Sequence, residues 1–166
     1  VFDKDWGTTG LTGDYRRAIV SDASQDWHHV VVTYNGNVAS TDNGMAVYID
    51  SVKKSVTTGG ADTEGMTPTS SNLLIGRIVH SSYQLAGHLT QFIMWGDYLL
   101  DQVEVNYLFA GGTENRNPLK NSSGYGGSGK VVLWLPLEDD LEDISGNEFN
   151  ATASGDAALS TASIPT

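Results

Sequence analysis

The sequence predicts an all-β fold, an antiparallel jelly-roll β-sandwich with one short surface helix. Three observations favour this fold class. Short apolar segments with strand-like patterns recur along the chain, glycine-rich turns separate them, and Gly, Ser, Thr and Asn supply much of the remaining sequence. The chain has 166 residues, which is enough for one sandwich. Strands at short, regular spacing are typical of sandwiches and jelly rolls.

The strongest strand signal covers residues 27–34 and ends at the turn dipeptide Asn35-Gly36. The other predicted strands share a short apolar run bounded by turn residues, and they cover residues 15–20, 45–50, 53–56, 72–77, 87–95, 130–137 and, weakly, 151–159.

One segment departs from the strand pattern. Within residues 99–109, four apolar residues fall at helical spacing, namely Leu100, Val103, Tyr107 and Leu108. Asp101 can begin such a helix, and Gly111-Gly112 can end it. The sequence therefore predicts a short surface helix in this segment.

Charge and composition exclude several classes of function. The formal net charge is −11 and the pI is about 4.4, which disfavours binding to nucleic acid or to anionic membrane surfaces. The chain has no cysteine, so disulfides and thiolate zinc sites are excluded. No apolar run approaches the roughly 20 residues of a membrane span. The start at Val1, without a signal segment, indicates a processed or truncated product.

An ordered series of motifs resembles the laminin-G-like, concanavalin A-like lectin/glucanase jelly-roll superfamily. The resemblance covers roughly residues 15–110. Its motifs are Trp27-His28-His29-Val30 with Thr33-Tyr34, then Val47-Tyr48-Ile49-Asp50, Leu74-Ile75-Gly76-Arg77, residues 87–95 and Tyr98-Leu99-Leu100-Asp101.

A second group of motifs resembles the first strands of such a domain but lies at the C-terminal end: residues 133–137, 143–147 and 150–152. Three explanations are open: a fragment of a tandem array, a circular permutation, or strands donated to a neighbouring subunit. We expect a laminin-G-like jelly roll, incomplete at its N-terminus, over residues 1–112 and a Gly/Ser/Asn-rich linker or long loop over 113–129. Residues 130–166 would then begin a second jelly roll, or complete the same or a neighbouring sandwich.

The acidic segment after residue 137 offers a catalytic hypothesis. Glu138, Asp140 and Glu142 match the E-x-D-x-E spacing of jelly-roll β-glucanases, and alternate residues of a strand share one face. A retaining glycosidase needs two carboxyls roughly 5 Å apart, whereas residues i and i+4 of a flat strand lie about 13 Å apart. Pro136 also indicates that the strand ends here. We therefore expect an acidic edge turn and no catalytic residues, with a jelly-roll glycoside hydrolase as the alternative.

The same turn concentrates hard oxygen donors, which suit the six to eight oxygen ligands of calcium. Calcium sites are known in many domains of the family that the chain resembles, so the resemblance implies calcium as a cofactor at this turn, with a solvated polar turn without metal as the alternative. Its candidate ligands are Asp139, Asp140, Asp143, Asn147 and Asn150.

Exposed aromatic rings stack on the CH groups of sugars in lectin-like modules. The candidate glycan platforms near turns are Trp6, Tyr15, Tyr83, Tyr98 and Tyr125, with partial burial as the alternative for each of them. Trp27, Trp95 and Trp134 are expected in the core. Adjacent strand residues point to opposite faces, so His28 and His29 are expected to pack or to be solvated rather than to bind one metal.

These expectations converge on a non-catalytic extracellular or virion-surface module for structure or adhesion. Domains that resemble this one bind receptors or glycans and recur in phage tail and capsid-decoration proteins. The expected partners are glycans or other protein subunits within a larger multi-domain or oligomeric assembly, with no nucleic acid and no membrane insertion.

Overall fold

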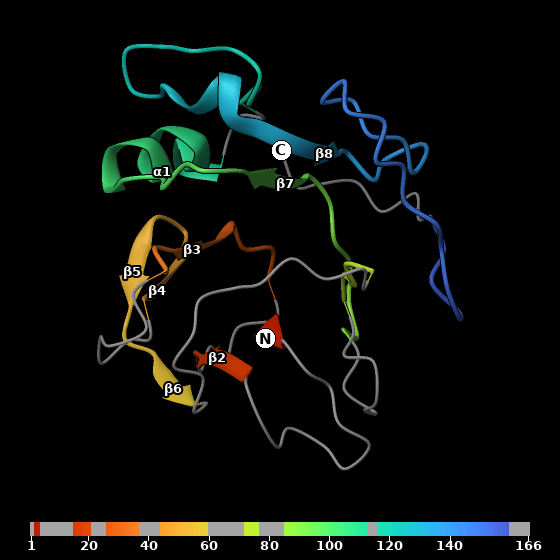
Figure 1. Cartoon of the computed structure of the whole chain (residues 1–166), viewed down its shortest axis with the longest axis horizontal. Coiled ribbons are helices and arrows are strands. Elements are labelled where there is room, and N and C mark those ends of the chain that lie inside the picture. Colours follow the sequence, from red (N-terminus) through yellow and green to blue (C-terminus); the bar gives the residue numbers. More distant parts are fainter. Residues whose placement is uncertain are drawn as a thin grey trace. The chain divides into compact units, whose positions relative to one another are not determined.

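The structure is a computed structural model, which describes residues 2–3, 15–20, 26–36, 44–59, 72–76, 85–112 and 116–159. The chain divides into two compact units, Val1–Gln84 and Leu85–Thr166. Small antiparallel sheets dominate the described residues, and one short α-helix accompanies them (Figure 1). The predicted all-β class is therefore confirmed at the level of a sheet-dominated fold.

The best-formed sheet of the first unit has three antiparallel strands in the order β3-β4-β5. These strands are β3 (Val30–Tyr34), β4 (Met45–Ile49) and β5 (Val52–Lys54). Val31 pairs with Tyr48 across β3 and β4, and both side chains are buried. Every side chain of β4 except Ala46 is buried, because this strand is central and has a neighbour on each side. The apolar strand patterns around residues 30 and 45 are therefore confirmed.

A two-residue turn connects β4 to β5. Ile49 pairs with Val52, and the intervening Asp50 and Ser51 have φ angles of 50° and 63°. Two consecutive positive φ angles are what a type I′ hairpin turn requires, and its twist matches that of the flanking strands. Asp tolerates this left-handed conformation better than most residues because its short polar side chain can form local hydrogen bonds.

The second sheet of this unit joins three short strands in the order β1-β2-β6. They are β1 (Phe2–Asp3), β2 (Tyr15–Ile19) and β6 (Thr57–Gly59). Strand β2 matches the prediction for residues 15–20. Strand β6 was not predicted, because Thr-Thr-Gly carries no apolar alternation.

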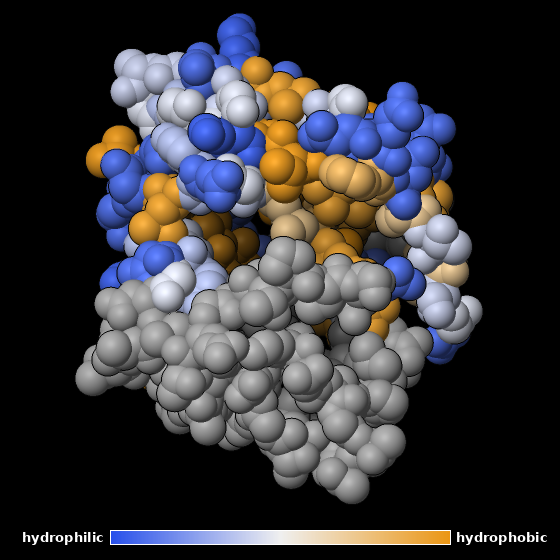
Figure 2. Space-filling view, in the orientation of Figure 1, coloured by the Kyte–Doolittle hydropathy of each residue, from blue (hydrophilic) through white to orange (hydrophobic). Residues whose placement is uncertain are grey.

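In the second unit, β7 (Phe92–Trp95) pairs antiparallel with β8 (Val131–Leu135). Strand β8 contains part of the first motif of the C-terminal group, residues 133–137. Val131, Leu133 and Leu135 of β8 are buried, and Val132 between them is exposed. Figure 2 shows apolar side chains over the β7–β8 pair. The register shifts between Met94 and Trp95. Gly96 follows this irregularity, and a Cβ atom there would lie 2.9 Å from Cγ1 of Val132.

The helix α1 (Gln102–Phe109) begins as the sequence predicts. Asp101 is its N-cap, and Asp101 and Glu104 form a reciprocal capping box. The helix ends at Ala110, which is left-handed, before the short 3₁₀ helix η1 (Ala110–Gly112). Val105 and Leu108 are buried, whereas Val103, a member of the predicted apolar stripe, is exposed.

Part of the stretch predicted as a linker or long loop packs against α1, through Tyr125 on Tyr107 and Gly126 on Glu104. Pro118, Tyr125 and Gly127 are buried there. The segment ends in a second 3₁₀ helix, η2 (Gly127–Lys130), which leads directly into β8. Figure 1 shows this segment returning past α1 before it enters β8.

Several predicted boundaries are corrected. Residues 72–76 form no strand, and Leu73 and Leu74 are exposed rather than paired in a sheet. Residues 151–159 form no strand either, because Ala, Ser, Gly and Asp supply few side chains that favour a pleated, half-buried surface. Strand β3 begins at Val30 rather than at residue 27, and β7 begins at Phe92 rather than at residue 87. Among the described residues, no helix has the length and apolar character of a membrane span.

Candidate functional site

The carboxylate of Asp143 is the centre of the turn that follows β8. Its Oδ1 accepts the backbone N–H groups of Trp134 and Ser145, both over 2.9 Å. Its Oδ2 accepts the Ser145 hydroxyl over 2.9 Å and the Phe149 N–H over 3.0 Å. A carboxylate has about four acceptor sites, so these four donors fill its capacity. The side chain thus fastens the turn to β8.

Hydrogen bonding also sets the charge state of Asp143. The residue is only 9% exposed, and this burial alone would raise the pKa of its carboxyl. The bonds from Trp134, Ser145 and Phe149 outweigh burial and hold the pKa below its ordinary value. Asp143 is therefore an ionised carboxylate that amide and hydroxyl dipoles stabilise.

Three of the other predicted calcium ligands also form hydrogen bonds within the turn or to β8. Asn150 accepts the N–H of Asp143 through Oδ1 over 2.8 Å, and the amide of Asn147 donates to the carbonyl of Val132 over 3.1 Å. Asp140 accepts the N–H of Glu142 over 3.0 Å, and Asp139 is exposed.

This donor set does not form a preassembled calcium cage, because Asp143 and Asn150 would have to exchange hydrogen bonds for metal bonds. In the part of the chain that the structure describes, no group of three His, Cys, Asp or Glu residues is arranged to hold a metal ion. Calcium binding at this turn stays a prediction.

Glu138, Asp140 and Glu142 do not share a strand face. Strand β8 ends at Leu135, and residues 136–142 form no strand, so strand alternation does not align the three exposed side chains. Glu138 instead accepts a hydrogen bond from the amide of Gln91 over 2.8 Å.

The predicted glycan platforms differ in how far their side chains are exposed. Tyr98 is half-buried, and its hydroxyl donates to Glu104 over 2.6 Å. This hydrogen bond, together with some burial, raises the pKa of Tyr98 to about 12. Tyr125 is only 2% exposed, so its ring lies in the core and offers no open face to a sugar. Trp6, Tyr83 and the side chain of Tyr15 lie outside the described residues.

Tyr125 belongs to a polar aromatic cluster that joins β7, α1 and the loop before β8. Its hydroxyl accepts the indole N–H of Trp95 over 2.7 Å and donates to the carbonyl of Pro118 over 2.8 Å. Its ring stacks on Tyr107 with centroids 5.9 Å apart and planes 2° apart. Arg116 lies over the Tyr107 ring, with Cζ 4.8 Å from the centroid. The cluster is internal to the unit and holds its loop in place.

Glu104 lies beside this cluster and is only 7% exposed. Its Oε1 accepts the Tyr98 hydroxyl and, over 3.0 Å, the N–H of Gly126. Its Oε2 accepts the N–H of Asp101 over 3.2 Å. One buried carboxylate thereby caps α1 and anchors the loop 22 residues further along the chain.

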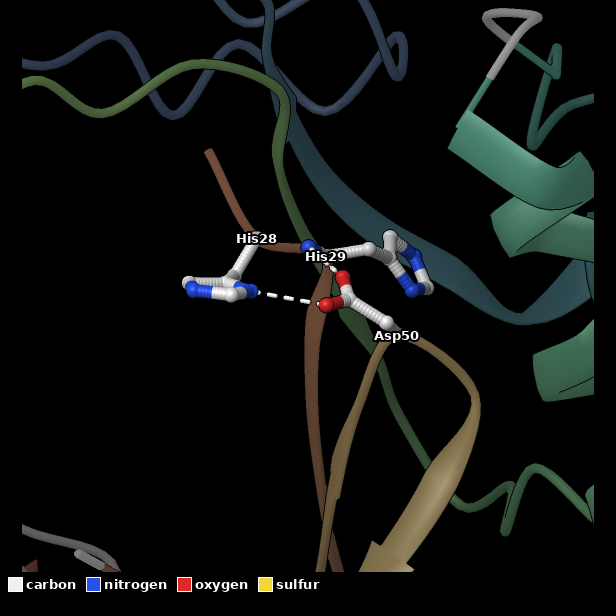
Figure 3. A network of polar contacts seen from close by, with 3 residues as sticks. All are labelled: His28, His29 and Asp50. Atoms are coloured by element: carbon white, nitrogen blue, oxygen red, sulfur yellow. Dashed lines mark hydrogen bonds and ion pairs between the residues drawn. The ribbon is translucent and has the colours of Figure 1, made fainter. Parts of the chain in front are cut away.

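The first unit contains a separate network around Asp50 (Figure 3). Asp50 Oδ2 lies 2.7 Å from Nδ1 of His28, and Oδ1 accepts the backbone N–H of His29 over 2.9 Å. The N–H of Asp50 donates to the carbonyl of His29 over 2.9 Å. Figure 3 shows the two imidazole rings pointing away from each other around this carboxylate. The network ties the type I′ turn to the start of β3.

Opposing effects act on the titration of this network. Burial lowers the pKa of His29 below its ordinary value, although the nearby Asp50 charge acts in the other direction. For Asp50, burial acts to raise the pKa, but the hydrogen bonds from His28 and His29 outweigh it and lower the pKa.

Sequence reasoning missed three residues with central roles, Gln91, Glu104 and Asp50. Asp101-x-x-Glu104 matches a capping box, so a local signal existed for Glu104. For Asp50 the sequence offers only its place at the end of the Val47-Tyr48-Ile49-Asp50 strand motif. Gln91 carries no local signal, because its partners Trp134 and Glu138 lie 43 and 47 residues away in sequence.

Comparison with known proteins adds no relative: no protein-family model, curated protein sequence or solved structure matches this chain.

Proposed function

We propose that this chain is a non-catalytic structural or adhesion module of an extracellular or virion surface, which also binds glycans. We propose further that its antiparallel strands belong to a jelly-roll β-sandwich of the laminin-G-like, concanavalin A-like kind. The ordered motifs from Trp27 to Asp101 and the sheet-dominated fold support this assignment.

The hydrogen bonds of two buried carboxylates support the non-catalytic part of the proposal. Glu104 and Asp143 both accept hydrogen bonds from backbone N–H groups of other segments. Glu104 accepts the N–H of Gly126, and Asp143 accepts the N–H of Trp134. Carboxylates held by such hydrogen bonds stabilise loops, whereas a general acid or base needs an oxygen directed at a substrate proton. The buried ionisable groups of the second unit thus favour mechanical stability over chemistry.

The negative net charge of the chain disfavours anionic partners. A net charge of −11 repels phosphate backbones and anionic lipid surfaces. Neutral glycans and other protein subunits are the partners that this surface favours, within a larger multi-domain or oligomeric assembly.

An assay on polysaccharide tests the proposal against its enzymatic alternative. The purified chain is incubated with a mixed-linkage β-glucan, and released reducing ends are measured against a protein-free blank. We expect no release above the blank. Release that disappears in Glu138→Gln and Glu142→Gln variants, but persists in an Asp156→Asn variant of an exposed acidic residue further along the chain, would replace the module with a glycoside hydrolase.

A further inference from the structure

Gln91 bridges an aromatic ring and a carboxylate where β7 begins and β8 ends. Its Oε1 accepts the indole N–H of Trp134 over 2.8 Å. Its Nε2 donates to Oε1 of Glu138, also over 2.8 Å. Trp134 and Gln91 are half-buried, and Glu138 is exposed. We call these three side chains the Gln91 surface.

The backbone around the Gln91 surface is held in an unusual conformation. Gln91 and Leu137, on the two facing segments, have φ angles of 53° and 60°, which residues other than glycine rarely adopt. The N–H of Gln91 and the hydroxyl of Thr90 both donate to the carbonyl of Pro136, each over 2.9 Å. Strained residues that the surrounding structure holds in place are often found at binding sites.

We propose that the Gln91 surface binds neutral hexose oligosaccharides. The proposal deepens the glycan-binding part of the proposed function and rests on it. Trp134 is half-buried rather than enclosed, and we infer that the accessible part of its indole ring stacks on sugar CH groups. Its bond to Gln91 holds the ring orientation. The Gln91 amide carries a second N–H hydrogen, and the Glu138 carboxylate has a second oxygen, Oε2. Together they supply one donor and one acceptor for sugar hydroxyls beside the ring.

The surrounding charge selects neutral sugars over acidic ones. Exposed Asp139, Asp140 and Glu142 follow Glu138 in the same turn, and the whole chain carries a net charge of −11. Uronates and sialic acids would meet like charge here, whereas the hydroxyls of neutral hexoses donate readily to carboxylates.

Titration of the full chain with defined oligosaccharides tests the proposal. The probes are cellohexaose, maltohexaose and mannohexaose, with tetragalacturonate as the acidic comparison, and the readout is the indole N–H resonance of Trp134 in a ¹⁵N-correlated NMR spectrum. We expect at least one neutral probe to shift this resonance with a Kd in the roughly millimolar range, and tetragalacturonate to leave it unmoved.

Two variants and one control locate the site. Gln91→Ala and the exposed Glu138→Gln should each weaken binding by about tenfold. Gln102→Ala should leave binding unchanged, because that exposed glutamine lies on α1, where its amide donates to Asn106. Glu138→Gln keeps the side-chain shape, so it tests the site even if Gln91→Ala fails to fold.

Two outcomes would overturn the proposal and separate it from the broader function. Binding that leaves Trp134 unmoved and survives both variants would place the sugar elsewhere while keeping glycan binding. If no neutral probe binds up to about 10 mM, both this site and the glycan-binding part of the proposed function are refuted. The non-catalytic structural role would still be tested by the reducing-end assay.

Discussion

Trp95 donates its indole N–H to the hydroxyl of Tyr125 over 2.7 Å, and this bond joins β7 to the loop that leads into β8. The same hydroxyl donates to the carbonyl of Pro118. Burial raises the pKa of Tyr125, although the bond from Trp95 acts in the other direction. A buried phenol that both accepts and donates makes the loop part of the core of this unit.

Replacing Tyr125 with phenylalanine should destabilise the Leu85–Thr166 unit. The ring and its stacking on Tyr107 remain, but the Trp95 N–H and the Pro118 carbonyl lose their shared partner. Leaving buried polar groups without a hydrogen bond costs about 1–3 kcal/mol. Urea unfolding would measure the loss, and Ser123→Ala, an exposed change in the same loop, should stay within about 0.5 kcal/mol of the parent. Equal stability of Tyr125→Phe and the parent would contradict the role of the hydroxyl.

Gly127 should not tolerate a methyl group. A Cβ atom there would lie 2.8 Å from Cε1 of Tyr98 and 2.9 Å from Cε2 of Tyr125. Both rings are held by hydrogen bonds, so Gly127→Ala should cost about 1–3 kcal/mol through overpacking. Gly129→Ala is the matched control in the same 3₁₀ helix, because a Cβ atom at Gly129 has no neighbour within 4 Å. Similar melting temperatures for the two variants would refute the crowding.

Substitution of Asp143 by asparagine should loosen the turn after β8. An amide in place of Oδ2 turns a donor toward the Phe149 N–H, which needs an acceptor, and the Ser145 hydroxyl loses its bond to a charged oxygen. Since hydrogen bonds to charged groups contribute about 1.5–3 kcal/mol each, we expect a loss of about 2 kcal/mol or more. Asp139→Asn, at an exposed position of the same turn, is the control. Thermal unfolding of the two variants provides the comparison, and equal melting temperatures would count against the role of Asp143.

Acid should destabilise the Val1–Gln84 unit in two stages. Burial lowers the pKa of His29 in the folded chain, so between the ordinary value and that lower one the unfolded state binds more protons, and stability falls as pH drops below about 6.5. The pKa of Asp50 is also lowered. Its contribution is complete above the ordinary Asp pKa and disappears as pH falls through the lower folded value. Denaturant unfolding from about pH 8 down to about pH 3 would follow both stages.

The variant His29→Gln separates these stages. It should remove the loss of stability below about pH 6.5 and keep the loss that follows the protonation of Asp50. A first stage of unchanged size in this variant would show that another group causes it.

Calcium should bind the turn after β8 only weakly, if the predicted site operates. Asp143 must give up hydrogen bonds to become a ligand, so the affinity should resemble that of weak extracellular calcium modules, with a Kd of about 10⁻⁴–10⁻³ M. Isothermal titration after chelation, with magnesium as the comparison ion, measures it. A trace without binding heat would remove calcium from the proposal.

Local signals account for the elements that the sequence predicted well. Strands β4 and β8 are apolar runs bounded by turn residues, and the start of α1 follows from the Asp101 cap and Glu104 three residues later. These features depend on residues close together in the chain. Residues 72–77 carry the same kind of apolar run, yet 72–76 form no strand, because strand formation requires a pairing partner that a short run does not specify.

The contacts that build the candidate sites depend on distant pairings. The bonds of Gln91 to Trp134 and Glu138 require the register of β7 with β8, in which Phe92 lies opposite Leu135. Tyr125 lies in a glycine-rich stretch without periodicity, so its burial follows only from packing against Tyr107 and Trp95. Its place near glycine-rich turns predicts an exposed ring, and this prediction is wrong because the ring is only 2% exposed.

The pairing of β7 with β8 has a consequence for the order in which the second unit assembles. Trp95 and Val131 are neighbours in the sheet, and closing the intervening loop costs about 3 kcal/mol from its length alone. Helix α1 lies inside that loop and has only eight residues, too few for a stable isolated helix. A nascent chain that has not yet reached Val131 would therefore carry a β7 edge without its partner, which exposes this stage of synthesis to aberrant strand pairing.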